Sequence, residues 1–120
     1  MTRSILIIED NAIIALDIER RLKSIGCGIA GVAATAAEAL DLAEKKRPVL
    51  ALVDIKLKGP VDGIEVATQL RDRFSIPFVF LTAHSDAGVK ASAMATGPAG
   101  YLLKPLRESE LEELVRKILT

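Results

Sequence analysis

Five short apolar runs alternate along the chain with five segments whose apolar residues recur at helical spacing. The runs lie at about 4–9, 29–32, 49–54, 77–81 and 100–103, and helices are expected at 11–24, from 35, from 62, at 85–94 and at 107–119. Strict alternation with short connections predicts an α/β fold, a doubly wound and mostly parallel sheet with right-handed crossovers. A chain of 120 residues is long enough for one domain, which we expect to span 1–120.

Local signals place several of the predicted helix ends. Thr35 with Glu38, and Asp62 with Glu65, have the spacing of helix-starting capping boxes. Gly26 is expected to end the first helix. The apolar stripe of that helix, at helical spacing, consists of Ile13, Ile14, Leu16, Ile18 and Leu22. The weakest predictions are the glycine-interrupted second strand and the helix at 85–94, which is rich in alanine and has a loop as its alternative.

The charge balance argues against several classes of function. Sixteen basic and sixteen acidic residues cancel, so the chain has no global field for nucleic acid or an anionic membrane, and direct DNA binding is not expected. Cys27 is the single cysteine, which excludes an internal disulfide and fits a reducing compartment. No leader pattern and no apolar stretch of roughly 20 residues is present, so we expect a cytoplasmic location.

Polar residues gather where the apolar runs end. Because parallel strands place their carboxyl ends at one edge of a sheet, these side chains should meet there. Carboxylates about 4 Å apart near a surface repel by about 4 kcal/mol, which a divalent cation and a lysine would offset. Mg²⁺ favours one or two carboxylates together with water and a phosphate oxygen. The residues concerned are Glu9, Asp10, Asp54, Thr82 and Lys104.

The order and spacing of these residues resemble a response-regulator receiver domain, and the resemblance covers the whole chain. The matching motifs are Glu9-Asp10, Asp54, Asp62-Gly63, Thr82-Ala83 and Lys104-Pro105. The resemblance implies a flavodoxin-like (βα)5 fold with a five-stranded parallel sheet of order 2-1-3-4-5. It also implies a signalling switch of a two-component system or phosphorelay, phosphorylated by a histidine kinase or phosphotransfer protein. Such a domain acts on a downstream protein effector and catalyses only its own phosphorylation and dephosphorylation.

The same resemblance assigns the metal and phosphoryl chemistry to particular residues. Asp54 would be the phosphoacceptor, and it would hold Mg²⁺ together with Asp10 and the backbone carbonyl of Lys56. Glu9 would act on the metal through water. These roles agree with phosphoryl-transfer chemistry, which needs an in-line nucleophile and charge neutralisation more than other help from the protein.

The resemblance also implies how phosphorylation would be transmitted. Thr82 and Lys104 would bind phosphoryl oxygens, and Thr82 with Tyr101 would form a switch that alters the face of the fourth helix, fifth strand and fifth helix. That face is also a candidate homodimer surface. The Lys104–Pro105 peptide bond would be cis.

Two features depart from the commonest receiver pattern. The loop after Asp54 is longer by one residue, with Pro60 displaced, and Pro98 restricts the entry to the fifth strand.

Lys56 and His84 occupy positions that flank the path of attacking water in receivers. Neither is acidic or amide-bearing, so we predict that they tune the lifetime of the phosphoryl group and that hydrolysis is slow.

Three alternative functions remain open on the same fold. A flavodoxin-like cofactor binder would need a phosphate loop where this chain has Glu9-Asp10-Asn11. A Mg²⁺-dependent aspartyl-phosphate phosphatase would need a second aspartate two residues after its nucleophile, where this chain has Ala12. A degenerate receiver would bind partners without phosphorylation, although all five site residues are present. The cognate kinase and the output are not predicted, and both a stand-alone protein and a fragment fit the sequence.

Overall fold

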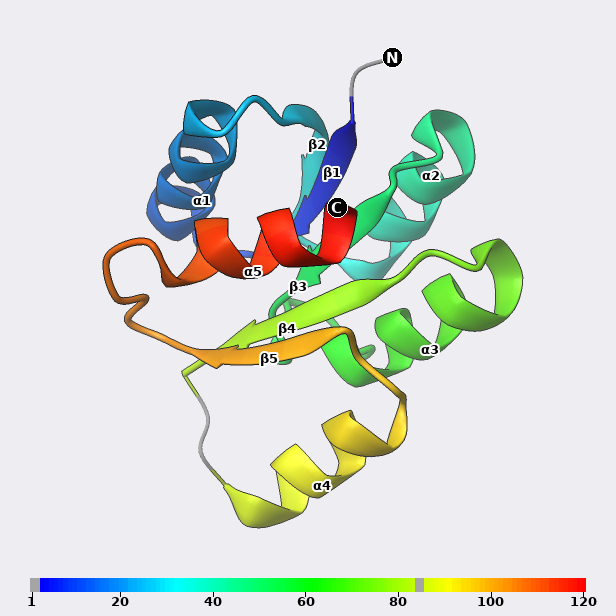
Figure 1. Ribbon diagram of the computed structural model, residues 1–120. Coiled ribbons are helices and arrows are strands. Elements are labelled where there is room, and N and C mark those ends of the chain that lie inside the picture. Colours follow the sequence, from blue (N-terminus) through cyan, green and yellow to red (C-terminus); the bar gives the residue numbers. More distant parts are fainter. Residues whose placement is uncertain (1–2, 84–85) are drawn as a thin grey trace.

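The computed structural model describes residues 3–83 and 86–120, which form one five-stranded parallel sheet flanked by helices (Figure 1). The strands are β1 (Ser4–Ile8), β2 (Gly28–Ala33), β3 (Leu50–Val53), β4 (Phe78–Thr82) and β5 (Gly100–Leu103). The helices are α1 (Ala12–Ser24), α2 (Ala36–Lys46), α3 (Gly63–Phe74), α4 (Ala87–Ala95) and α5 (Glu110–Leu119). The strand order is β2-β1-β3-β4-β5, which confirms the predicted fold.

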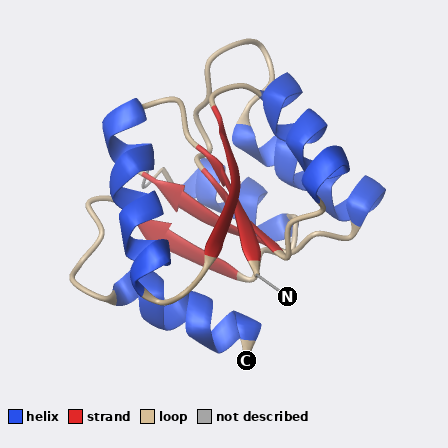
Figure 2. Cartoon of the chain, turned by 90° about the horizontal axis from the view of Figure 1, so that it is seen from above, coloured by secondary structure: helices blue, strands red, loops and turns tan. Residues whose placement is uncertain are grey.

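Alternate residues of the central strands face opposite sides of the sheet and build two separate cores. Leu6, Ile8, Phe78 and Phe80 point to the side covered by α2, α3 and α4. Ile5, Ile7, Val79 and Leu81 point to the side covered by α1 and α5. Figure 2 shows the sheet between these helices. Since both faces are covered, the strands are apolar throughout, as expected for a buried parallel sheet.

Side-chain caps start three of the helices where the sequence places them. Asn11 accepts from the amides of Ile13 and Ile14, Thr35 from Glu38, and Asp62 from Glu65. Each cap satisfies backbone donors that would otherwise have no partner at the helix start.

The predicted start of the last helix at residue 107 is wrong, because α5 begins at Glu110. A turn precedes it, in which the Glu110 amide donates to the Arg107 carbonyl at 2.9 Å. The guanidinium of Arg21, on α1, donates to the carbonyl of Glu108. Arg21 thus contacts the turn that precedes α5, and no local pattern in the sequence predicts this contact.

The apolar stripe of α1 is buried only in part. Ile18 and Leu22 are buried, but Ile13 is 81% exposed and Leu16 is 47% exposed. Helical spacing alone does not show which apolar residues of a helix are buried, and here the apolar stripe includes residues that face solvent. Ile13, in the first turn of α1 just after the carboxyl end of β1, is the most exposed of these residues.

Helix α4 is present but loosely packed, in line with its weak apolar pattern. Ala93 is buried, Val89 is partly buried, and Met94 remains 48% exposed. Its carboxyl end is tied to α3, because Arg71 donates to the Thr96 carbonyl at 2.8 Å. Across the described residues, no helix has both the length and the apolar character needed to cross a bilayer.

Candidate functional site

The residues of the site are aimed by the sheet itself. The Asp54 amide donates to the Ile8 carbonyl, and the Lys104 amide donates to the Thr82 carbonyl, both at 2.9 Å. The parallel hydrogen-bond ladder therefore continues past the ends of β3 and β5. The Glu9 amide is held in the same way by the last residue of β2. The side chains that follow these strands consequently leave the sheet at one edge, its carboxyl edge.

Three carboxylates converge at this edge. Glu9, Asp10 and Asp54 each place an oxygen within 4.8 Å of the other two. Glu9 is 3% exposed and Asp54 is 9% exposed, so their charges are only weakly screened by water. Clustered hard oxygen donors of this kind suit Mg²⁺ or a similar divalent cation.

Lys104 lies among these acids. Its Nζ forms an ion pair with Glu9 Oε1 and lies 3.3 Å from Asp54 Oδ2. The lysine therefore offsets part of the repulsion between two nearly buried carboxylates. Asp10 differs, since its carboxylate has no hydrogen-bond or ion-pair partner within residues 3–83 and 86–120. Asp10 is thus the acid most available to an incoming cation.

Gly63 allows the helix α3 to approach Asp54 closely. A methyl group at this glycine would lie 2.0 Å from the Asp54 carbonyl oxygen, which is backbone and cannot move aside cheaply. The Gly63 amide also donates to the Ile55 carbonyl at 2.6 Å. The Asp62-Gly63 pair therefore combines a helix cap with a contact that fixes the backbone at Asp54.

Thr82 and Tyr101, the predicted switch pair, sit on neighbouring strands. Thr82 is fully buried at the end of β4. The Tyr101 ring makes an edge contact with Phe80, with centroids 6.3 Å apart, and Lys90 of α4 lies with its Nζ 5.4 Å from the ring centre. Partial burial raises the pKa of the Tyr101 hydroxyl. The ring thus lies between the sheet and α4, and Lys90 is a neighbour that the sequence did not indicate.

A family model for the response regulator receiver domain matches residues 5–116. The chain belongs to this family. Receiver domains are signalling domains of the two-component type rather than conventional enzymes.

Curated relatives of this receiver domain are longer regulators. It is 33% identical over 120 residues to the phyllosphere-induced regulator PhyR of Methylorubrum extorquens, covering 99% of the chain and 44% of PhyR. It is 37% identical over 109 residues to the transcriptional regulatory protein PdtaR of Mycobacterium tuberculosis, covering 91% of the chain and 53% of PdtaR. The chain thus spans about half the length of these relatives.

Solved structures agree with the fold. The signal receiver domain of a modulated diguanylate cyclase from Desulfovibrio desulfuricans matches with a TM-score of 0.90 and 33% identity, covering 98% of this chain and 93% of that one. A CheY-like receiver domain protein from Methanospirillum hungatei also gives a TM-score of 0.90, at 27% identity, covering 99% and 94%. These likenesses extend over the whole sheet and its helices.

The remaining predicted site features of the receiver domain have mixed outcomes. The Lys104–Pro105 peptide bond is cis, as the resemblance implied. The Lys56 side chain is exposed, two residues after Asp54 in the chain. His84, the second predicted lifetime residue, lies outside the described residues, so its assignment stays a prediction.

An apolar groove beside Lys104 was missed at the sequence level. It runs along α1 and the segment after β5, and Asp17, Arg21 and Lys104 supply its charged margin. Its apolar lining is Ile13, Ile14, Ile18, Ala83, Pro105 and Leu106. The place of Ile13 in the apolar stripe does not predict this groove, because periodicity cannot separate a buried stripe from a stripe that faces a partner.

Proposed function

We propose that residues 1–120 act as a single cytoplasmic receiver domain that accepts a phosphoryl group on Asp54 from a histidine kinase or phosphotransfer protein. The observation that carries this proposal is the meeting of Glu9, Asp10 and Asp54 within 4.8 Å, with Lys104 against two of them. Three carboxylates this close repel one another, and a bound cation would relieve that repulsion. The cluster is therefore suited to a reaction that first binds a cation and then transfers a phosphoryl group.

Asp54 is the nucleophile of the proposed reaction. One carboxylate oxygen attacks the phosphorus of a phosphohistidine, the phosphorus–nitrogen bond breaks, and the imidazole leaves as the neutral ring after taking up a proton. The product is an aspartyl phosphate. Lys104 then moves its charge from the carboxylates toward the phosphoryl oxygens, and Thr82 supplies a hydroxyl to them.

Asp10, Asp54 and the Lys56 carbonyl are the proposed ligands of Mg²⁺, with Glu9 acting through water. The oxygen donors present fit this ion, which would neutralise charge on the transferred group. Asp10 lacks a partner among the described residues, whereas Glu9 is occupied by Lys104 and by the Asn11 amide, 3.1 Å from Glu9 Oε2. This difference supports Asp10 as the direct ligand and Glu9 as the indirect one.

The groove along α1 is the proposed docking place of the phosphodonor. A donor must reach Asp54 from the carboxyl edge, and Ile13, the most exposed large apolar residue of the described chain, lines that approach. Burial of the apolar surface beside the reaction site would contribute affinity for the partner, and the charged residues at its margin would fix the orientation in which the partner binds.

The output side of the proposal involves Thr82 and Tyr101. Movement of Thr82 toward the phosphoryl group would let the Tyr101 ring change its packing against α4, shifting the population of two arrangements. The face made by α4, β5 and α5 would then bind a downstream effector or a second copy. The aspartyl phosphate is expected to be long-lived, since the exposed Lys56 offers no carboxylate or amide to orient water.

The decisive test is incubation with Mg²⁺ and a small-molecule phosphodonor, followed by intact mass measurement. The wild type should gain one acid-labile phosphoryl group, and Asp54→Asn should gain none while keeping its circular dichroism spectrum. Asp41→Asn, which changes an exposed acid on α2, is the matched control and should behave as wild type. Stoichiometric phosphate on Asp54→Asn would contradict the assignment, and no phosphate on the wild type would favour a degenerate receiver.

A further inference from the structure

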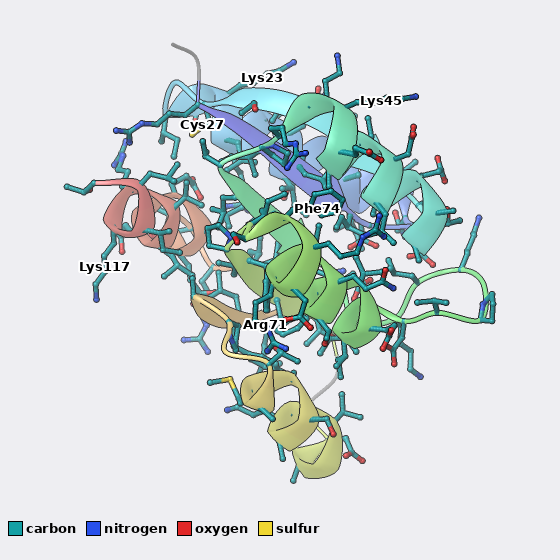
Figure 3. The ribbon with its side chains drawn as sticks, turned by 90° about the vertical axis from the view of Figure 1, so that its right-hand side faces the viewer. Lys23, Cys27, Lys45, Arg71, Phe74 and Lys117 are labelled. Atoms are coloured by element: carbon teal, nitrogen blue, oxygen red, sulfur yellow. The ribbon has the colours of Figure 1, made fainter. Side chains whose placement is uncertain are left out.

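The loop between β3 and α3 is tied down at its base and at its middle. The bond from the Gly63 amide to the Ile55 carbonyl closes the base. In the middle, Lys58 forms an isolated parallel bridge with Thr35, the residue that caps α2. Figure 3 shows the loop, in pale green, reaching toward the start of α2.

The bridge pairs the segments that follow β2 and β3, two strands that are not neighbours in the sheet. Strand β1 lies between β2 and β3, but it ends at Ile8 and the chain then turns away into α1. Thr35 follows β2 and Lys58 follows β3, so their pairing closes the gap that β1 leaves. The bridge therefore lies beyond the end of β1, after which Glu9 and Asp10 follow in the chain.

Side chains on both sides of the bridge hold the loop against the protein. Leu57 and Val61 are partly buried and pack on the core beneath α2 and α3. Ile55 is 4% exposed, so the Lys56 backbone is fixed between two anchored neighbours. Gly59 follows the bridge with φ +96°, a left-handed conformation that L side chains rarely adopt.

We propose that the Lys58–Thr35 bridge is a positioning device for the cation site. It holds the Lys56 carbonyl in place beside Asp54 before a cation arrives, so that binding does not have to order the loop. This inference rests on the proposed Mg²⁺ site. An ordered loop loses little conformational entropy on binding, which raises affinity without any new contact.

The test is Mg²⁺ titration by calorimetry, without phosphodonor, on wild type and Gly59→Ala. A methyl group at residue 59 would meet nothing within 4 Å, so the substitution acts through backbone strain alone. Relief of that strain requires the loop to leave the bridge, and we expect the Mg²⁺ Kd to rise about fivefold or more. Faster amide hydrogen exchange at residues 58 and 59 should accompany the change.

Gly26→Ala is the matched control. Gly26 has φ +87°, also has nothing within 4 Å of an added methyl group, and lies at the end of α1, away from the acids. It should lose similar stability to Gly59→Ala but keep the wild-type Kd. A second variant, Leu57→Ala with Val61→Ala, frees the loop from the core and should also raise Kd. Wild-type affinity in both loop variants would overturn the positioning role, whereas absence of Mg²⁺ binding in the wild type would overturn the metal site itself.

Discussion

Charged side chains are arranged differently at the two edges of the sheet: acids cluster at the carboxyl edge, and arginines stack on an aromatic ring at the amino edge. At the carboxyl edge, Glu9, Asp10 and Asp54 are crowded together with one lysine. At the amino edge, where α2 and α3 end, the guanidiniums of Arg47 and Arg73 lie 5.3 Å and 5.0 Å from the centre of the Phe74 ring, labelled in Figure 3. Cations suit the carboxyl ends of helices, so these charges lower the energy of the fold.

The charges at the amino edge contribute to the stability of the fold, whereas those at the carboxyl edge form the proposed reaction site. Arg47 and Arg73 are exposed and stack on an aromatic ring, so losing one should cost little. Glu9 and Asp54 are nearly buried and mutually repulsive, so their arrangement is tolerable only because Lys104 is present. Equal numbers of acids and bases in the whole chain conceal this segregation.

The largest expected effect comes from glycines at the two edges. Gly63→Ala places a methyl group 2.0 Å from the Asp54 carbonyl and should lower the free energy of unfolding by about 3 kcal/mol or more. Gly97→Ala, after α4 at the amino edge, meets nothing within 4 Å and should cost only the left-handed strain at φ +77°, about 1–2 kcal/mol. Urea denaturation measures both. Equal losses would show that α3 does not constrain the Asp54 backbone.

The sequence alone predicts most of this molecule because its signals are local. The caps at Thr35 and Asp62 and the continuous apolar strands agree with the fold at every level. The site residues could be predicted as a group because β-strand ends bring them to one edge whatever the details of packing.

What the sequence does not predict depends on contacts between distant segments. Arg21 of α1 reaches the Glu108 carbonyl just before α5, and the Lys58–Thr35 bridge joins the segments that follow β3 and β2. Ile13 looks like a core residue because its spacing fits the buried stripe, although it faces solvent. Lys90 reaches Tyr101 only because α4 packs beside β5.

A smaller effect distinguishes a lysine at each edge. Lys104→Met leaves Glu9 and Asp54 without their cation and should cost about 2–3 kcal/mol at neutral pH. Lys45→Met removes an exposed i,i+4 pair with Asp41, 3.0 Å apart, and should cost under about 1 kcal/mol. Saturating Mg²⁺ should stabilise both variants, because both keep the acids, but it should raise the melting temperature of Lys104→Met more, since the ion there replaces the missing cation. If thermal melts with Mg²⁺ rose equally for both, Lys104 would not be offsetting the charge of these acids.

A still smaller effect belongs to the amino edge alone. Arg73→Met keeps the length of the side chain but removes its cation from the Phe74 ring, and should cost about 0.5–1 kcal/mol. Arg20→Met, on the exposed surface of α1, is the control and should be neutral. Neither change should alter Mg²⁺ affinity in a calorimetric titration. A changed affinity in Arg73→Met would mean that the two edges are coupled.

The smallest expected effect is a pH dependence at the amino edge. Burial raises the pKa of the Cys27 thiol, at the start of β2, although the charge of Arg3 opposes this. A thiol whose pKa is higher in the folded chain keeps its proton longer there than in the unfolded chain. Its contribution to stability is therefore complete below the unfolded pKa, about 8.5, and is lost as pH rises through the folded pKa. Urea midpoints at pH of about 7 and about 9.5 should fall slightly more for wild type than for Cys27→Ala. An identical fall in both proteins would mean that Cys27 titrates alike in the folded and unfolded chain, and that alkaline sensitivity arises elsewhere.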